Sequence, residues 1–129
     1  IGEALLAPHR CYWPAIKQAM EEGLPLAGIA HITGGGLYDN VPRILPDGVS
    51  VRFQAAAIPT APPIFSLLRA VGEIEEHELY RVFNMGVGMV WFVPPEAVTA
   101  ALSLCRSHDL AAAVIGEVLP GDKQVEIEL

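Results

Sequence analysis

Residues 27–37 read AGIAHITGGGL, and this stretch decides the fold of the region around it. Its first six residues form a short apolar run bounded by Pro25 and the glycines, which predicts a buried strand. The glycine triplet at 34–36 follows, and a turn is expected there because each glycine costs about 0.5–1 kcal/mol inside regular structure relative to alanine. Apolar residues at helical spacing from 37 to 45 then predict a short helix after the turn.

Hydrophobic periodicity predicts the other elements. Residues 49–54 alternate apolar and polar, as half-buried strands do, and residues 86–93 are apolar on both faces, which predicts a central strand. Further strands are expected at 112–118 and 124–129, and helices at 14–23, 64–69, 75–83 and 96–108. This mixture indicates an α/β or α+β class, with a mixed β-sheet and helices packed on it. The last two strands are expected to form an antiparallel hairpin across Gly121 and Asp122.

The composition indicates one compact domain. The chain has 129 residues, of which 52% are hydrophobic and 18% charged, which suits a single packed core. A mean hydropathy of +0.39 is high for a domain of this size, so some apolar surface is expected to meet another domain or subunit. The chain starts at Ile1 with no initiator methionine or signal peptide, which predicts a fragment or an excised domain.

Charge and cysteine usage narrow the partners and the location. The net charge of −7 argues against nucleic acid, although a single phosphate group needs only one arginine and a few backbone amides. No apolar run reaches the roughly 18–20 residues of a membrane span, so no membrane partner is expected. Cys11 and Cys105 match neither a disulfide framework nor a zinc pattern, which fits a reducing, cytoplasmic location.

The glycine triplet and its neighbours each allow two interpretations. The glycine amides could form an anion site suited to phosphate, or glycine could serve only the sterics of a tight turn. His31 could exchange a proton near neutral pH or be a satisfied core group. Arg43 could bind a phosphate through both guanidinium nitrogens or be a plain surface cation. Thr33 and Asn40 could contact a ligand or cap the chain locally.

Several other sites are excluded or disfavoured. The triplet is followed by no G-K-[ST] and is not a G-x-G-x-x-G fingerprint, so a Walker loop and NAD binding are excluded. Four glutamates lie between residues 73 and 78 at an expected helix start. A solvated acidic face favoured by the helix dipole is expected there rather than a metal site.

Two motifs stand out in the chain as a whole. The first comprises residues 30–37 (AHITGGGL) and 40–43 (NVPR), and the second comprises residues 80–89 (YRVFNMGVGM). Together they resemble the C-terminal half of the phosphoribosylformylglycinamidine cyclo-ligase family, also called AIR synthetase. The likeness extends from residue 1 to residue 117, in the family's order and spacing. Residues 1–129 are thus expected to be one domain, with the family's N-terminal ATP-binding half absent.

The resemblance implies a ligase of purine biosynthesis. Members of the family spend ATP, with Mg²⁺, to close the imidazole ring of formylglycinamidine ribonucleotide, giving aminoimidazole ribonucleotide, ADP and phosphate. In that chemistry the formyl oxygen is phosphorylated, a nitrogen of the amidine attacks, and phosphate leaves. ATP and Mg²⁺ bind mainly to the N-terminal half, and a homodimer is expected. The fragment is therefore expected to be inactive alone.

The resemblance also implies residue roles. His31 is the expected catalytic residue, and no metal ligand is implied. The residues implied to bind the ribonucleotide substrate or its phosphate are Arg10, Thr33, Gly34, Gly35, Gly36, Asn40, Arg43, Asn84, Met85 and Gly86.

One early segment departs from the family. Members often read P-T-R-I-Y-x-K where this chain has PHRCYWP at residues 8–14. His9 could substitute for the hydroxyl donor, whereas Pro14 cannot replace the ammonium group of a lysine. Alternatively, the segment is a surface helix start at which proline is tolerated.

Two other classes of function stay open. The first is a non-catalytic ligand-binding or interaction domain that keeps the fold, and the changes at His9 and Pro14 favour it. The second is a sibling ATP-using enzyme of the formylglycinamidine synthase, selenophosphate synthetase or thiamine-phosphate kinase type. Retention of His31, the glycine triplet, Asn40 and Arg43 favours the cyclo-ligase.

Overall fold

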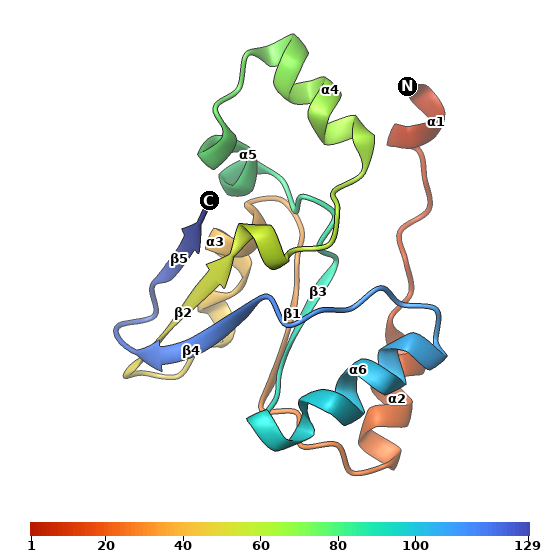
Figure 1. Ribbon diagram of the computed structural model, residues 1–129, viewed down its shortest axis with the longest axis vertical. Coiled ribbons are helices and arrows are strands. Elements are labelled where there is room, and N and C mark those ends of the chain that lie inside the picture. The colour runs from red at the N-terminus through yellow and green to blue at the C-terminus, as the bar shows by residue number, and fades with distance from the viewer.

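The computed structural model describes all 129 residues, and it contains two small β-sheets with helices packed around them (Figure 1). One sheet pairs β1 (Gly28–His31) with β3 (Met89–Phe92), and the other has the order β4 (Gly116–Pro120), β2 (Val49–Gln54), β5 (Val125–Glu128). The helices are α1 (Gly2–Leu5), α2 (Trp13–Glu21), α3 (Gly36–Asn40), α4 (Pro63–Gly72), α5 (Glu76–Val82) and α6 (Val98–Ser107), with 3₁₀ turns η1 (Pro42–Ile44), η2 (Ala55–Ala57) and η3 (Pro95–Ala97). The chain is an α+β fold with a mixed sheet, as the sequence predicts.

The two-stranded sheet holds the first motif in place. β1 and β3 pair antiparallel, with Gly28 opposite Phe92 and His31 opposite Met89. The expectation of a central strand at 86–93 is wrong, because only 89–92 are strand and β1 is its only partner. The run is apolar on both faces for another reason: Val90 is buried in the main core, whereas Trp91 packs against a second cluster.

The three-stranded sheet corrects the expected hairpin. β4 and β5 do not pair with each other; both flank β2, β4 running antiparallel and β5 parallel to it. The connection between them crosses the start of β2, where the Gly121 amide donates to the carbonyl of Gly48 (3.1 Å) and the Lys123 amide to that of Val49 (2.7 Å). The chain therefore passes from one edge of β2 to the other, and a two-residue hairpin cannot form.

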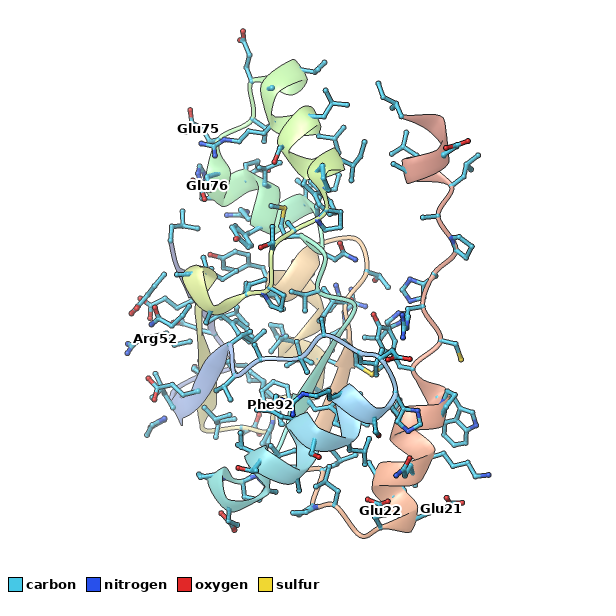
Figure 2. All side chains as sticks on the ribbon, turned by 45° about the vertical axis from the view of Figure 1, so that its right-hand side comes forward. Glu21, Glu22, Arg52, Glu75, Glu76 and Phe92 are labelled. Carbon is cyan, nitrogen blue, oxygen red and sulfur yellow. The ribbon has the colours of Figure 1, made fainter.

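Arg52 links all three strands of this sheet. Its Nε lies 3.2 Å from a carboxylate oxygen of Glu126 and 3.3 Å from one of Glu128, and its Nη1 lies 3.9 Å from Glu117. The hydrogen bond to Glu126 is the main reason why the pKa of Arg52 is raised. Figure 2 shows Arg52 at the outer side of the sheet, where such cross-strand charge pairs favour this register.

The buried side chains form two clusters. The main cluster lies between the two sheets and α3, and its most deeply buried large side chains are Ile32, Leu37, Val41 and Phe53. The second joins α2 to α6, which lie side by side at one end of the molecule (Figure 1). There the small side chains of Ala15 and Ala19 allow α2 to approach Leu104 closely.

Most element boundaries agree with the sequence to within a few residues. Pro14 lies in the first turn of α2, and Gly23, with φ of 71°, follows its end. The strand expected from residue 112 begins only at Gly116, since the ladder with β2 ends where Gly116 lies opposite Phe53. The short helix α1 was not predicted.

Much of the apolar surface stays exposed, as the hydropathy predicts. Only 18 of the 129 residues are buried. An open groove of about 600 Å³ lies between β3, α6 and the segment leading into β4, and 19 of the 22 residues lining it are apolar. Val118, on its rim, is 51% exposed. No helix in the structure has both the length and the hydropathy needed to cross a bilayer.

Candidate substrate-binding site

The glycine turn, residues 33–36, joins the end of β1 to the start of α3. Gly35 and Gly36 have φ values of 87° and 56°, a region that is strained for residues with a side chain. The Gly36 amide donates to the carbonyl of Thr33 (3.1 Å), and the Gly35 amide donates to the carbonyl of Val82 at the end of α5 (3.2 Å). The backbone conformation therefore requires glycine at positions 35 and 36.

Gly36 is also the point where the two sequence motifs meet. A Cβ on Gly36 would lie less than 3.0 Å from the backbone carbonyl oxygens of Tyr80 and Phe83. Because these oxygens belong to backbone, they cannot move aside as a flexible side chain would. The absence of a side chain at Gly36 thus allows the glycine turn to pack directly on the end of α5.

The second motif continues as a tight turn beside this contact. The Gly86 amide donates to Oδ1 of Asn84 (3.0 Å), and the Val87 amide donates to the Asn84 carbonyl (2.9 Å). Met85 is buried and has φ of 49°, a conformation that few non-glycine residues adopt. Gly86 follows with φ of 86°. Asn84 and Gly86 shape this turn, and Met85 faces the interior.

Asn40 fastens the glycine turn from inside. It is 5% exposed, and its Nδ2 donates to the carbonyls of Gly36 (2.8 Å) and Gly34 (3.2 Å). Its Oδ1 accepts a hydrogen bond from Oγ1 of Thr33 (3.2 Å). These bonds use the Asn40 amide within the protein, and the Thr33 hydroxyl keeps only acceptor capacity while it donates to Asn40.

The groups left free in the glycine turn lie at its first two residues. The amides of Thr33 and Gly34 make no hydrogen bond in the structure, and both residues are exposed. The amides of Gly35 and Gly36 are occupied, and the Asp39 carboxylate lies over Gly35, as acidic groups often do at a helix start. A ligand oxygen could therefore reach the outer amides but not the inner ones.

His31 lies immediately before these free amides. It is exposed at the end of β1, and its Nε2 lies 2.8 Å from Nε2 of His9. The two imidazole rings meet edge to face, with centroids 4.9 Å apart. His31 is thus not a buried core group, and its imidazole is accessible to a ligand.

The two arginines expected at the site are Arg10 and Arg43. Arg10 donates from Nη2 to the carbonyls of His108 (3.0 Å) and Asp109 (2.9 Å), at the end of α6. Arg43 is exposed in η1, where Ile44 packs against Gly28 at the start of β1. His31 is three residues further along this strand, which corresponds to about 10 Å at the usual rise. The structure shows no hydrogen bond or ion pair between either guanidinium and the glycine turn.

The acidic segment at the start of α5, residues 73–78, forms a charged surface. Glu76 pairs with Arg69 (3.4 Å) and Glu78 with Arg81 (3.9 Å), and Figure 2 shows Glu75 and Glu76 at the outer end of this helix. No group of three or more His, Cys, Asp or Glu side chains could hold a metal ion. Burial, with a smaller effect of Glu76, raises the pKa of Tyr80 in the same helix.

These features define an α+β domain with a glycine turn packed on a second, Asn84-centred turn, and comparisons with known proteins place it in a family. Residues 1–128 match the family model described as AIR synthase related protein, C-terminal domain. The chain therefore belongs to this family.

Curated relatives extend the match along almost the whole chain. The chain is 42% identical over 127 residues to a phosphoribosylformylglycinamidine cyclo-ligase of Lachnospira eligens, covering 98% of this chain and 37% of that protein. It is 44% identical over 122 residues to one of Caldanaerobacter subterraneus subsp. tengcongensis and 40% identical over 122 residues to one of Bacillus subtilis, covering in each case 95% of this chain and 35% of the relative. The chain thus spans little more than a third of the length of these relatives.

Sequence reasoning missed three features of this site. The His9 contact joins residues 22 positions apart, and the Arg10 contacts join residues 98 and 99 positions apart. The Asp39 carboxylate over Gly35 could have been found, since it lies four residues later in a predicted helix, one turn along. Pro14, which stands where family members often have lysine, lies in the first turn of α2, where proline is tolerated. This agrees with the interpretation of residues 8–14 as a surface helix start.

Proposed function

We propose that this chain is the substrate-side part of an ATP-dependent cyclo-ligase, which closes the imidazole ring of formylglycinamidine ribonucleotide to give aminoimidazole ribonucleotide. The observation that carries this proposal is the family match over residues 1–128, together with relatives of 42% and 44% identity that are named phosphoribosylformylglycinamidine cyclo-ligase. The contact between the two motifs at Gly36 supports it, since both would then face one ligand.

The chemistry requires positioning and charge stabilisation more than covalent help from the protein. Phosphorylation turns the formyl oxygen into a leaving group, an amidine nitrogen attacks the activated carbon, a C–N bond forms and phosphate departs. In this proposal His31 exchanges the proton of the attacking nitrogen. The outer amides of Thr33 and Gly34 hold an anionic oxygen of the substrate, as unpaired backbone amides do in anion sites.

The other expected site residues take supporting roles. Gly35, Gly36 and Asn40 give the glycine turn its shape, and Asn84 with Met85 and Gly86 shapes the surface beside it. Arg10 holds the N-terminal segment against α6. Arg43, which makes no ion pair, stabilises negative charge on a part of the ribonucleotide that extends toward the start of β1.

ATP supplies the phosphoryl group in this reaction, and Mg²⁺ neutralises its charge. This chain offers no set of three or more side chains suited to a metal ion, so we assign both ligands to the N-terminal half of the complete protein. We further propose that this half covers the apolar groove between β3 and α6, that the complete enzyme is a homodimer, and that it works in the cytoplasm. The exposure of the groove and the chain's 37% share of its relative's length support the first of these.

A second candidate is a non-catalytic domain of the same fold. The hydrogen bonds of Arg10 to carbonyls at the end of α6 favour this candidate, because a guanidinium used there is less available to bind a ligand. The Asp39 carboxylate favours it too, because it would repel a phosphate near the inner amides.

The test is an assay of the complete protein with formylglycinamidine ribonucleotide, ATP and Mg²⁺. We expect aminoimidazole ribonucleotide, ADP and phosphate to appear in equal amounts. A folded protein that forms none of them would support the non-catalytic candidate. Turnover only with the substrate of a sibling enzyme, such as selenide or thiamine phosphate, would assign the chain to that class instead.

A further inference from the structure

The His31 side chain makes its hydrogen bond to His9, and the residues that follow His9 hold it there. Arg10, the next residue, is fixed to two carbonyls at the end of α6. The ring of Tyr12 lies against Gly88, since a Cβ on Gly88 would collide with the phenol, and Gly88 in turn accepts a hydrogen bond from Ile32 (3.0 Å). The segment that carries His9 is thus tied to the same strand pair that carries His31.

The contact between the two imidazoles limits where their protons can be. The two Nε2 atoms lie 2.8 Å apart, and a hydrogen bond between them requires one N–H and one lone pair. The contact therefore contains one proton. A second proton at this position would make both nitrogens donors and would separate the rings.

No other charged group competes for these rings. Neither histidine takes part in an ion pair. The Tyr12 ring, whose centroid lies 6.1 Å from that of His9, belongs to the same segment as His9. Across the sheet His31 faces Met89, which does not titrate. In the glycine turn the nearest carboxylate is that of Asp39, which lies over Gly35. His9 is thus the group that engages Nε2 of His31.

We propose that His9 is a positioning residue for His31: it engages Nε2 and fixes the orientation of the His31 ring, so that Nδ1 is the nitrogen that exchanges a proton with the substrate. This inference rests on the proposed function, in which His31 is the proton-exchanging group. A neutral imidazole whose Nε2 is engaged has one nitrogen left for proton exchange. Because the contacts of Arg10 and Tyr12 hold the His9 segment in place, the fold determines which nitrogen of His31 is left free.

The test uses three variants of the complete protein. His9→Phe keeps an aromatic ring but removes both nitrogens, His9→Gln keeps a donor and an acceptor, and His77→Phe changes an exposed histidine of α5 that makes no side-chain hydrogen bond. Nitrogen chemical shifts of the His31 ring report its tautomer in each variant. The cyclo-ligase assay gives kcat and KM as functions of pH.

We expect His9→Phe to change the His31 nitrogen shifts and to move the pH profile of kcat. It should lower kcat about 10-fold, less than the roughly 10²–10⁴-fold that a proton-transfer group itself contributes, because His31 stays in place. His9→Gln should restore most of kcat, and His77→Phe should change none of these quantities. Unchanged His31 shifts in His9→Phe would overturn the proposal. So would changed shifts with a pH profile identical to that of the unsubstituted enzyme.

The nitrogen shifts keep this test separate from the proposed function. If the unsubstituted complete protein has no cyclo-ligase activity, the proposed function fails. The positioning of His31 by His9 is then still supported or overturned by the shifts alone.

Discussion

Replacing Gly36 with alanine should destabilise the chain by about 2–4 kcal/mol, as the sum of a strained positive φ and an overpacked contact. The φ of 56° at Gly36 is unfavourable for alanine, and the new Cβ would lie less than 3.0 Å from the carbonyl oxygens of Tyr80 and Phe83. Both oxygens are backbone atoms, so relief requires the turn to separate from α5. Urea unfolding followed by tryptophan fluorescence measures the effect.

The neighbouring residue provides a matched control. Gly34 lies in the same triplet, but its φ is not positive and a Cβ there would meet nothing within 4 Å. Gly34→Ala should therefore change the free energy of unfolding by less than about 0.5 kcal/mol, as exposed substitutions usually do. Equal effects of the two substitutions would show that the turn does not pack on α5 as described.

Replacing His31 with alanine should lower kcat of the complete enzyme at least about 100-fold, since positioned proton-transfer groups contribute roughly 10²–10⁴-fold. The KM for ATP should change little, because the nucleotide is assigned to the N-terminal half. The exposed position of His31 makes the substitution compatible with folding. Steady-state kinetics measure both constants, with His77→Ala as the matched histidine control.

Two outcomes would contradict the role of His31. A kcat unchanged by His31→Ala would remove His31 from the reaction. A loss of kcat accompanied by an equal loss in His77→Ala would indicate a general effect of histidine substitution on this chain.

The local elements of the fold could be predicted because their signals are local. The apolar run before the glycines, the triplet itself and the helical spacing after it each act within a few residues, and β1, the glycine turn and α3 follow in that order. Pro14 and Gly23 likewise mark the ends of α2 from within the helix or next to it.

The pairing of the last strands could not be predicted in this way. β5 pairs with β2 across more than 70 residues, and nothing within residues 116–128 distinguishes that pairing from a hairpin. The alternation of apolar and polar residues in β5 fits either partner. The crossing is fixed by backbone bonds from Gly121 and Lys123 to the start of β2.

The sequence indicates candidate residues for the site but not which of their polar groups stay free. The glycine triplet and His31 indicate a ligand site from sequence, yet the inner amides are taken by Val82 and Thr33. Arg10 and Arg43 suit a phosphate by residue type; the structure bonds Arg10 to carbonyls at the end of α6, and Arg43 is exposed in η1. Only tertiary contacts decide which polar groups remain free.

The central claim is that the outer face of the glycine turn binds the ribonucleotide, and amide chemical shifts of the complete protein test it most directly. Titration with formylglycinamidine ribonucleotide should shift the amide resonances of Thr33 and Gly34 strongly, because these amides are free. The amides of Gly35 and Gly36, already bonded within the protein, should shift less. If saturating ribonucleotide leaves the resonances of Thr33 and Gly34 unchanged while the enzyme turns over, the substrate binds elsewhere and the account is wrong.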